Sequence, residues 1–295
     1  MPHDQERSAQ GSIVRPQLFQ ASAQNDESIA QMVLLLDQQD AMPSARRLHD
    51  WAIESAGVRP GELVIDLGSG TGTMSRKLAE LVAPSRAGGP MGRVIGIEPN
   101  ARLRTVAMSR VEASGVPNIS VIDGLAGALP FDDASVDLVW CERVLQHVKD
   151  PQAAINDIAR VLRPGGRAVL LDSDHGTRIF SHLDPDVATA FSRASLVPYA
   201  NPYAARYIPG QVRRAGLLLD ADIGSSAFVF SSEILLRAQL MRVVADDAIQ
   251  SGELARDVAE DAVCAVNEAA ERGEVFAAVT VFGFVARKVD VASSA

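Results

Sequence analysis

The chain has 295 residues, of which 47% are hydrophobic and 22% are charged, which is long enough and apolar enough to bury one large core. Its formal net charge of −9 argues against nucleic acid as a partner, because proteins that bind phosphates normally present a positive surface. Only two cysteines occur and no stretch is apolar enough for a signal peptide or membrane span, so we expect a cytoplasmic protein without disulfides or a bound metal.

Residues 1–45 are predicted to form a polar arm followed by a helix over 26–39, which would act as a lid or as an oligomer contact. A second helix is expected from about Pro43, since proline suits the first turn of a helix. It would end at Gly57, shortly before the short apolar segment 63–67.

Residues 46–175 alternate short apolar segments with amphipathic ones. Short apolar strands joined by amphipathic helices predict a parallel sheet covered on both faces, so the fold class is α/β, Rossmann-like and doubly wound. The five strands are expected at 63–67, 93–98, 119–123, 136–141 and 167–172.

The last third of the sequence changes character. Residues 176–210 are rich in turn formers and carry all three tyrosines, which predicts a lid over the substrate, with core packing as the alternative role for the aromatic rings. Residues 211–295 would complete the sheet, with a strand over 217–230 and another over 275–287. Between them, the helical insertion 233–271 would cap the pocket or form a homodimer surface.

The strongest local signal is the sequence Val-Ile-Asp-Leu-Gly-Ser-Gly-Thr-Gly at 64–72. A buried strand here ends in a turn where three glycines let the backbone pass close to a ligand. The first N–H groups of the next helix can then face a carboxylate, while Asp66 offers negative charge to an ammonium group.

Two further carboxylates end the next two strands. Glu98 can accept hydrogen bonds from both hydroxyls of a ribose, and Asp123 can accept one from an adenine amino group. Because the carboxyl ends of parallel strands meet at one edge of the sheet, we expect a nucleoside there. Helix or turn capping is the alternative role for each carboxylate.

These motifs resemble those of class I S-adenosylmethionine-dependent methyltransferases. The resemblance is to the small-molecule branch typified by ubiquinone and menaquinone biosynthesis, methyltransferase type 11. VIDLGSGTG resembles the first motif of that family, VIGIEPN its acidic second-strand motif, and ARVLRPGGRAVLLD the segment that ends in its fifth strand. The resemblance covers about residues 48–175 and implies a seven-stranded sheet whose last strand is antiparallel, with helical caps at both ends of the chain.

The resemblance also implies a set of residues that hold S-adenosyl-L-methionine. Gly68 and Gly70 would approach the methionine moiety, Glu98 the ribose, and Cys141 would offer its backbone near the amino-acid end. Pro99 follows the acidic position where a bulkier apolar residue is frequent, so the residue that covers the adenine face is left open. The full expected set is Asp66, Gly68, Ser69, Gly70, Thr71, Gly72, Glu98, Pro99, Asp123, Gly124, Leu125 and Cys141.

Three polar residues near the ends of strands four and five are candidates for catalysis. His147 follows strand four and can act as a base near neutral pH, or else make a structural hydrogen bond. Asp172 and His175 follow strand five and can bind the acceptor or accept its proton, or else form a solvated turn. Methyl transfer is an in-line displacement, so alignment and desolvation alone can supply much of the catalysis.

The expected function is methyl transfer to O, N or C of a small-molecule acceptor, in secondary metabolism for example. One alternative is a non-methylating enzyme or binding protein that keeps the cofactor on the same fold. A nicotinamide-dependent oxidoreductase is disfavoured because the turn reads Gly-Ser-Gly-Thr-Gly and lacks the Gly-x-Gly-x-x-Gly spacing. Nucleic acid, protein and membrane partners have no support from the charge of the chain.

Overall fold

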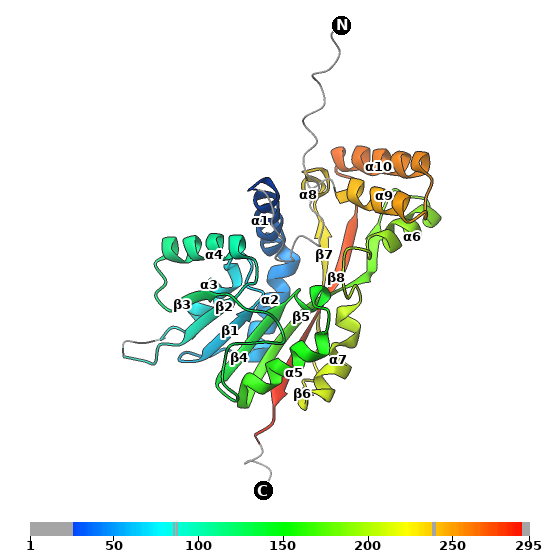
Figure 1. Cartoon of the computed structure of the whole chain (residues 1–295). Helices are drawn as coiled ribbons and strands as arrows, with labels where there is room; N and C mark the ends of the chain where they lie inside the picture. The colour runs from blue at the N-terminus through cyan, green and yellow to red at the C-terminus, as the bar shows by residue number, and fades with distance from the viewer. Residues whose placement is uncertain (1–25, 85, 87, 238–239, 291–295) are drawn as a thin grey trace.

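The computed structural model describes residues 26–84, 86, 88–237 and 240–290; the predicted arm at 1–25 lies outside this range. One mixed sheet forms the centre of the protein, with strands in the order β3-β2-β1-β4-β5-β8-β6 and with β7 also paired to β8 (Figure 1). The strands are β1 Leu63–Leu67, β2 Arg93–Ile97, β3 Ile119–Ile122, β4 Val136–Glu142, β5 Leu162–Phe180, β6 Leu217–Leu219, β7 Gly224–Phe230 and β8 Ala277–Lys288.

The first five strands are parallel and the last three pair antiparallel, which confirms the predicted fold class. Eight strands occupy seven positions, because β6 and β7 share one edge of β8. Leu219 pairs with Ala286 and Gly224 with Gly283, so residues 220–223 interrupt what is otherwise one continuous edge strand. The expected strand over 217–230 is therefore two strands.

Adjacent residues of a strand point to opposite faces of the sheet, and helices cover both faces of its parallel part. Val64 and Trp140 pack with α2 and α3 in one cluster, whereas Ile65 and Cys141 pack with α5 and α7 in another. Each cluster is fully apolar at its centre, as a sheet buried on both faces requires. The helices are α1 Asp26–Ala41, α2 Pro43–Ala56, α3 Thr73–Val82, α4 Ala101–Ser114, α5 Pro151–Val161, α6 Pro185–Ala194, α7 Ala204–Arg214, α8 Ser232–Arg237, α9 Leu240–Gln250 and α10 Arg256–Glu271.

The C-terminal lobe, which comprises α6, α8, α9, α10 and the far ends of β5, β7 and β8, extends beyond the parallel sheet (Figure 1). Strand β5 reaches Phe180, where Ile179 and Phe180 pair with Ala278 and Ala277 after a break in register. The short strand expected at 167–172 is thus much longer, because β8 pairs with it from Arg167 to Asp174 and again at Ile179 and Phe180. The helical insertion divides where Gly252, with φ +76°, follows α9.

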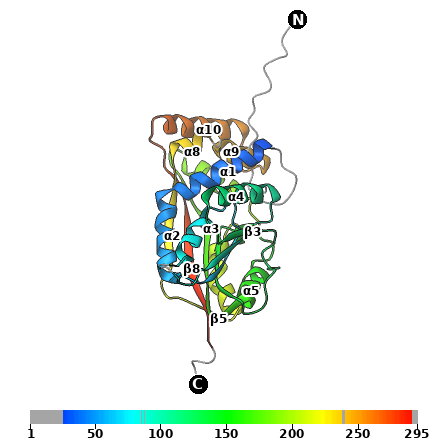
Figure 2. The same ribbon diagram turned by 90° about the vertical axis from the view of Figure 1, so that its left-hand side faces the viewer.

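Helix α1 crosses the open side of the sheet edge, between α4 and the helices of the C-terminal lobe (Figure 2). A paired charge fixes it there: Arg110 of α4 donates to both carboxylate oxygens of Asp37, at 2.7 and 2.8 Å. A Cβ atom built on Gly70, in the turn after β1, would lie 3.5 Å from Cδ1 of Leu36 of α1. Helix α1 therefore closes over the carboxyl ends of β1 and β2.

Candidate functional site

The turn between β1 and α3 requires glycine for steric reasons. Gly68 has φ +75°, and a Cβ atom at this position would lie 2.3 Å from Cγ2 of Val144. The backbone N–H groups of Gly68 and Ser69 both donate to the carbonyl of Ile97, at 2.8 and 3.0 Å. These two hydrogen bonds hold the turn against the end of β2. At Gly68, Val144 leaves no room for a side chain.

Two buried carboxyl groups stand beside this turn. Asp66 accepts a hydrogen bond from Ser75 at 2.6 Å, and burial raises its pKa to about 7. Glu98 accepts the backbone N–H groups of Gly70 (3.0 Å) and Asn100 (2.8 Å), and burial raises its pKa to about 7 as well. Both carboxyl groups are therefore buried beside the turn, where their oxygens can accept hydrogen bonds from a ligand.

The third expected carboxylate is placed differently. The side chain of Asp123 is 73% exposed and pairs with Arg104 at 2.8 Å. Arg104 also donates to the carbonyls of Glu98 and Pro99, at 2.7 and 2.8 Å, so this cation ties β2 to the end of β3. The residues that line the cavity on this side are Pro99, Gly124 and Leu125.

A cavity of about 850 Å³ joins the glycine turn to the C-terminal lobe. Eleven of the expected site residues line this cavity, and four do not. Gly72, Asp123, Cys141 and Asp172 lie behind or beside the lining. Those in the lining are Asp66, Gly68, Ser69, Gly70, Thr71, Glu98, Pro99, Gly124, Leu125, His147 and His175.

Helix α1 forms the lid of this cavity through residues between Gln31 and Asp40. Arg143, which follows β4 with φ +54°, donates to the side chain of Gln39 and to Asp40 at 3.3 Å. A non-glycine residue in this conformation is strained, and the contacts to α1 hold it in place. Burial raises the pKa of Asp40.

The orientation of Glu142 depends on a partner far away in sequence. His49 of α2 lies 3.0 Å from Oε1 of Glu142, and the indole of Trp140 donates to its other oxygen at 3.3 Å. Burial alone would raise the pKa of Glu142, but His49 and Arg143 outweigh it and lower the pKa to about 2. Glu142 is therefore an anion in the cavity wall. The sequence held no signal for its pairing with His49.

Four side chains form a hydrogen-bonded chain along the cavity wall. Arg178 donates to Nδ1 of His175 at 2.9 Å, and because a guanidinium has only donors, Nδ1 is the acceptor. Nε2 of His175 then donates to Oε1 of Gln146 at 2.9 Å. The amide nitrogen of Gln146 donates in turn to Nε2 of His147 at 3.0 Å. Each histidine is thus held as one neutral tautomer.

The pKa values agree with this arrangement. Burial lowers the pKa of His147 to about 4, and burial with the nearby charge of Arg178 lowers the pKa of His175 well below its usual range. At neutral pH both imidazoles are uncharged, and the Nε2 of His147 already accepts a hydrogen bond. These rings can therefore orient an acceptor better than they can remove its proton.

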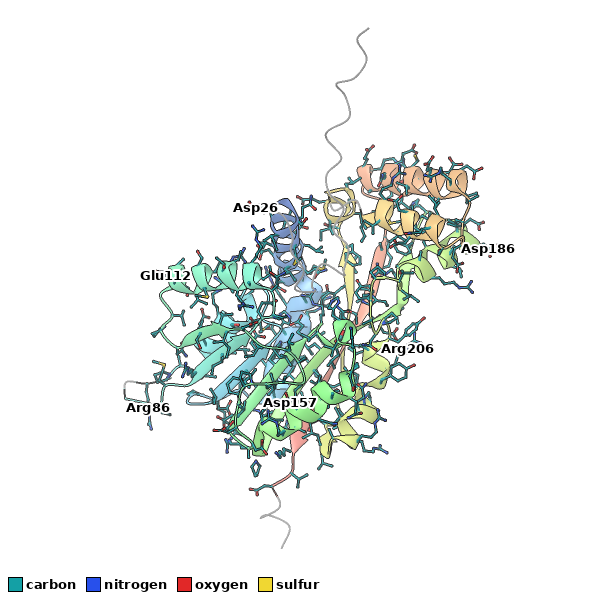
Figure 3. The ribbon with its side chains drawn as sticks, viewed as in Figure 1. Asp26, Arg86, Glu112, Asp157, Asp186 and Arg206 are labelled. Atoms are coloured by element: carbon teal, nitrogen blue, oxygen red, sulfur yellow. The ribbon has the colours of Figure 1, made fainter. Side chains whose placement is uncertain are left out.

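Asp172 lies below the cavity wall and holds the turn that carries His147. Its oxygens accept the backbone N–H groups of Gln146 at 3.3 Å and Ser173 at 2.8 Å, and burial raises its pKa to about 7. Asp174 is also occupied, because Arg206 of α7, labelled in Figure 3, donates to it at 2.9 Å. Both carboxyl groups thus support the local fold.

The far half of the cavity is mainly apolar. Tyr199 stacks on His175 with 3.7 Å between ring centroids, so this tyrosine belongs to the cavity wall. Tyr203 instead packs against Arg206, and Tyr207 is 61% exposed. The apolar residues lining this half are Pro198, Phe228, Phe230, Ile234, Leu240, Val243, Val244 and Val279.

Two negative findings apply to the described part of the chain. No helix within residues 26–290, outside the gaps named above, is long and apolar enough to cross a membrane. Over the same residues, no group of three or more His, Cys, Asp or Glu side chains is arranged to hold a metal ion.

The strand order, the glycine turn and the acidic end of β2 agree with what the resemblance to class I, Rossmann-like methyltransferases predicted. Residues 65–170 match the model of a methyltransferase domain family. S-adenosylmethionine is the cofactor of that class. This confirms the family and the cofactor that the motifs predicted.

Among sequence relatives, the chain is 34% identical over 147 residues to the ubiquinone/menaquinone biosynthesis C-methyltransferase UbiE of Hahella chejuensis. That alignment covers 50% of this chain and 57% of the relative. The chain spans about half the length of the curated relatives it matches.

Two solved structures share the fold. The YcgJ protein of Bacillus subtilis has a TM-score of 0.60 at 20% identity, over 83% of this chain and 99% of that one. A phosphoethanolamine N-methyltransferase of Haemonchus contortus, solved with phosphomonomethylethanolamine and S-adenosylhomocysteine, has a TM-score of 0.58 at 18% identity, over 94% of this chain and 61% of that one. At these identities the likeness establishes the fold alone.

Proposed function

We propose that this chain transfers the methyl group of S-adenosylmethionine to a small-molecule acceptor. The observation that carries the proposal is the single cavity, which joins the glycine turn and Glu98 at one end to an apolar chamber at the other. A reaction between two bound molecules needs such a continuous space. A volume of about 850 Å³ is in the range of sites that hold a cofactor with a small substrate.

The residues of the cofactor half fit this group chemically. Glu98 would accept the ribose hydroxyls, the turn from Gly68 would pass along the methionine moiety, and Leu125 would cover part of the adenine. The hydroxyl of Ser69 and the amide oxygen of Gln31 are buried here without a hydrogen-bond partner in the described residues. Buried polar atoms are normally paired, so these two are ready to bind a polar ligand.

The acceptor half would act by positioning. The cofactor supplies a methyl group activated by a sulfonium, and the protein excludes water with α1 and the C-terminal lobe. His147 and His175 would touch the acceptor as neutral rings, while Asp172 holds the turn that carries His147. Alignment and desolvation then supply most of the rate, as an in-line displacement permits.

The first test is calorimetric titration with S-adenosylmethionine and S-adenosylhomocysteine. We expect micromolar affinity, about −8 kcal/mol, for the wild type and at least a roughly tenfold loss in Glu98→Gln. Glu112→Gln, an exposed carboxylate on α4 (Figure 3), is the matched control and should bind as the wild type does. Thermal unfolding of each variant separates lost binding from lost folding, since Glu98 also supports the turn at Gly70.

Turnover is tested by transfer of labelled methyl groups to a panel of O, N and C acceptors, with S-adenosylhomocysteine measured as the second product. Methylated product would support the proposal. Tight cofactor binding with no product across the panel would instead indicate a protein that keeps the cofactor for another purpose. Failure to bind either cofactor form would remove the proposal altogether.

A further inference from the structure

Arg178 differs from the other cations that line the cavity. Arg143 is paired with Asp40 and Glu142, and Lys149 is exposed to solvent. Arg178 is half-buried, and no carboxylate of the described residues lies within 4.0 Å of its guanidinium, although Asp247 lines the same cavity. Of its five N–H donors, one is used, toward the uncharged ring of His175.

The position of Arg178 follows from the irregular stretch of β5. The pairing of β5 with β8 breaks between Asp174 and Ile179, and the hydroxyl of Thr177 takes the place of a ladder partner by accepting the N–H of Thr280 at 2.9 Å. This bulge brings Arg178 beside His175 in the cavity wall. β-Bulges commonly re-aim a side chain near a functional site.

One of the remaining donors of Arg178 is buried without a partner. The Nε atom of Arg178 is shielded from solvent and has no hydrogen-bond partner in the described residues. A buried N–H donor without a partner is costly, and the cost is relieved when an anion accepts from it and from the neighbouring N–H groups of the guanidinium. A carboxylate fits that fork with two parallel hydrogen bonds.

The neighbouring surface defines the rest of the ligand. Phe228, Phe230 and Val244 line the same end of the cavity, and Tyr199 covers the ring of His175. These groups offer contact to carbon and very few polar partners. Building on the proposed function, we infer that the methyl acceptor is a small, mainly apolar carboxylic acid whose carboxylate binds Arg178.

The test compares acids with their uncharged amides, using benzoate, 2-naphthoate and 4-phenylbutanoate and the three primary amides. Calorimetry is done with and without saturating S-adenosylhomocysteine, on wild type, Arg178→Met and Arg178→Lys. Arg213→Met, an exposed arginine of α7, is the matched control. For the acid that fits best, we expect the wild type to prefer acid over amide by about tenfold.

Arg178→Met should abolish this preference, Arg178→Lys should retain part of it, and Arg213→Met should match the wild type. The affinity for S-adenosylhomocysteine should stay within about twofold in all four proteins. The inference is overturned if acids and amides bind the wild type equally, if no acid binds, or if the preference survives in Arg178→Met. Loss of S-adenosylhomocysteine binding in Arg178→Met would also overturn it, because Arg178 would then serve the cofactor carboxylate.

Failure of the proposed function gives a different result. A wild type that binds no S-adenosylhomocysteine would contradict the methyltransferase proposal. The comparison of acids with amides in the absence of cofactor would still decide whether Arg178 recognises a carboxylate.

Discussion

The two halves of the cavity are built in different ways. The cofactor half consists of backbone turns and carboxyl groups that directly follow β1 and β2, such as Gly68 and Glu98. The acceptor half combines side chains from β5, β7, α9 and the turn after β4, including Arg178, Phe228 and His147. The cofactor half corresponds to short sequence motifs. The acceptor half forms only when segments that are distant in the sequence pack together.

This difference has a chemical basis. A cofactor of fixed structure can be bound by backbone N–H groups and a few carboxylates, and these need a particular turn at the end of a strand. An acceptor is recognised by the shape and charge of a chamber, which many combinations of side chains can form. Variants that act on one half and spare the other can therefore test the division.

The largest effect is expected from Gly68→Ala, a substitution in the cofactor half of the cavity. The new Cβ would meet Val144 at 2.3 Å and force the positive φ, lowering the free energy of unfolding by about 2–4 kcal/mol. Chemical denaturation measures this loss, and S-adenosylhomocysteine affinity should fall at least about tenfold with it. Gly57→Ala is the control, since it has φ +59° but open space around it and should cost only about 1 kcal/mol.

Adding Val144→Ala to Gly68→Ala should restore part of the lost stability, because it removes the atom that clashes. If Gly68→Ala is no worse than Gly57→Ala, the close approach of the turn to Val144 does not constrain the cofactor half.

A second, smaller effect concerns Asp172, which supports the wall between the two halves. The pKa of Asp172 is about 7 in the folded protein, compared with 3.8 for an ordinary aspartate side chain. Between these two pH values the folded state therefore binds more protons than the unfolded state. The wild type therefore loses stability from this group as pH rises from about 4 to 7. The slope is at most about 1.4 kcal/mol per pH unit.

Asp172→Asn lacks this titration but loses one accepted hydrogen bond. We expect it to be less stable than the wild type at pH 4 and to recover relative to it as pH rises to 7, measured by denaturation at each pH. A deficit that grows with pH would show that the folded protein stabilises the carboxylate, contrary to burial as the dominant cause.

The smallest effect is expected at the lid. Asp37→Asn removes the charge that pairs α1 with Arg110, a half-exposed contact worth about 0.5–1 kcal/mol. S-adenosylhomocysteine affinity should fall about two- to fivefold, and amide hydrogen exchange in α1 should quicken. Asp50→Asn, which breaks the exposed pair with Lys77 outside the cavity, is the control. Equal effects of the two variants would mean that α1 does not close on the ligand.

In the C-terminal lobe, the sequence predicted one strand well and did not predict the extension of another. The apolar alternation after Ala277 predicted the last strand well, but the polar run from Asp172 to Arg178 concealed the extension of β5. Strand pairing decided that extension, since β8 supplies a partner for backbone groups whatever side chains they carry. The same bulge that interrupts the alternation brings Arg178 into the cavity wall.

The sequence by itself determined the parallel sheet, the glycine turn and the carboxylates of Asp66 and Glu98, because these depend on local periodicity and on residues adjacent to a strand end. Only the tertiary structure decided the pairing of His49 with Glu142, the ion pair of Arg110 with Asp37 and the hydrogen-bonded chain from Arg178 to His147. The physical reason is distance along the chain. Contacts between segments tens of residues apart arise from packing, which leaves no periodic trace in the sequence.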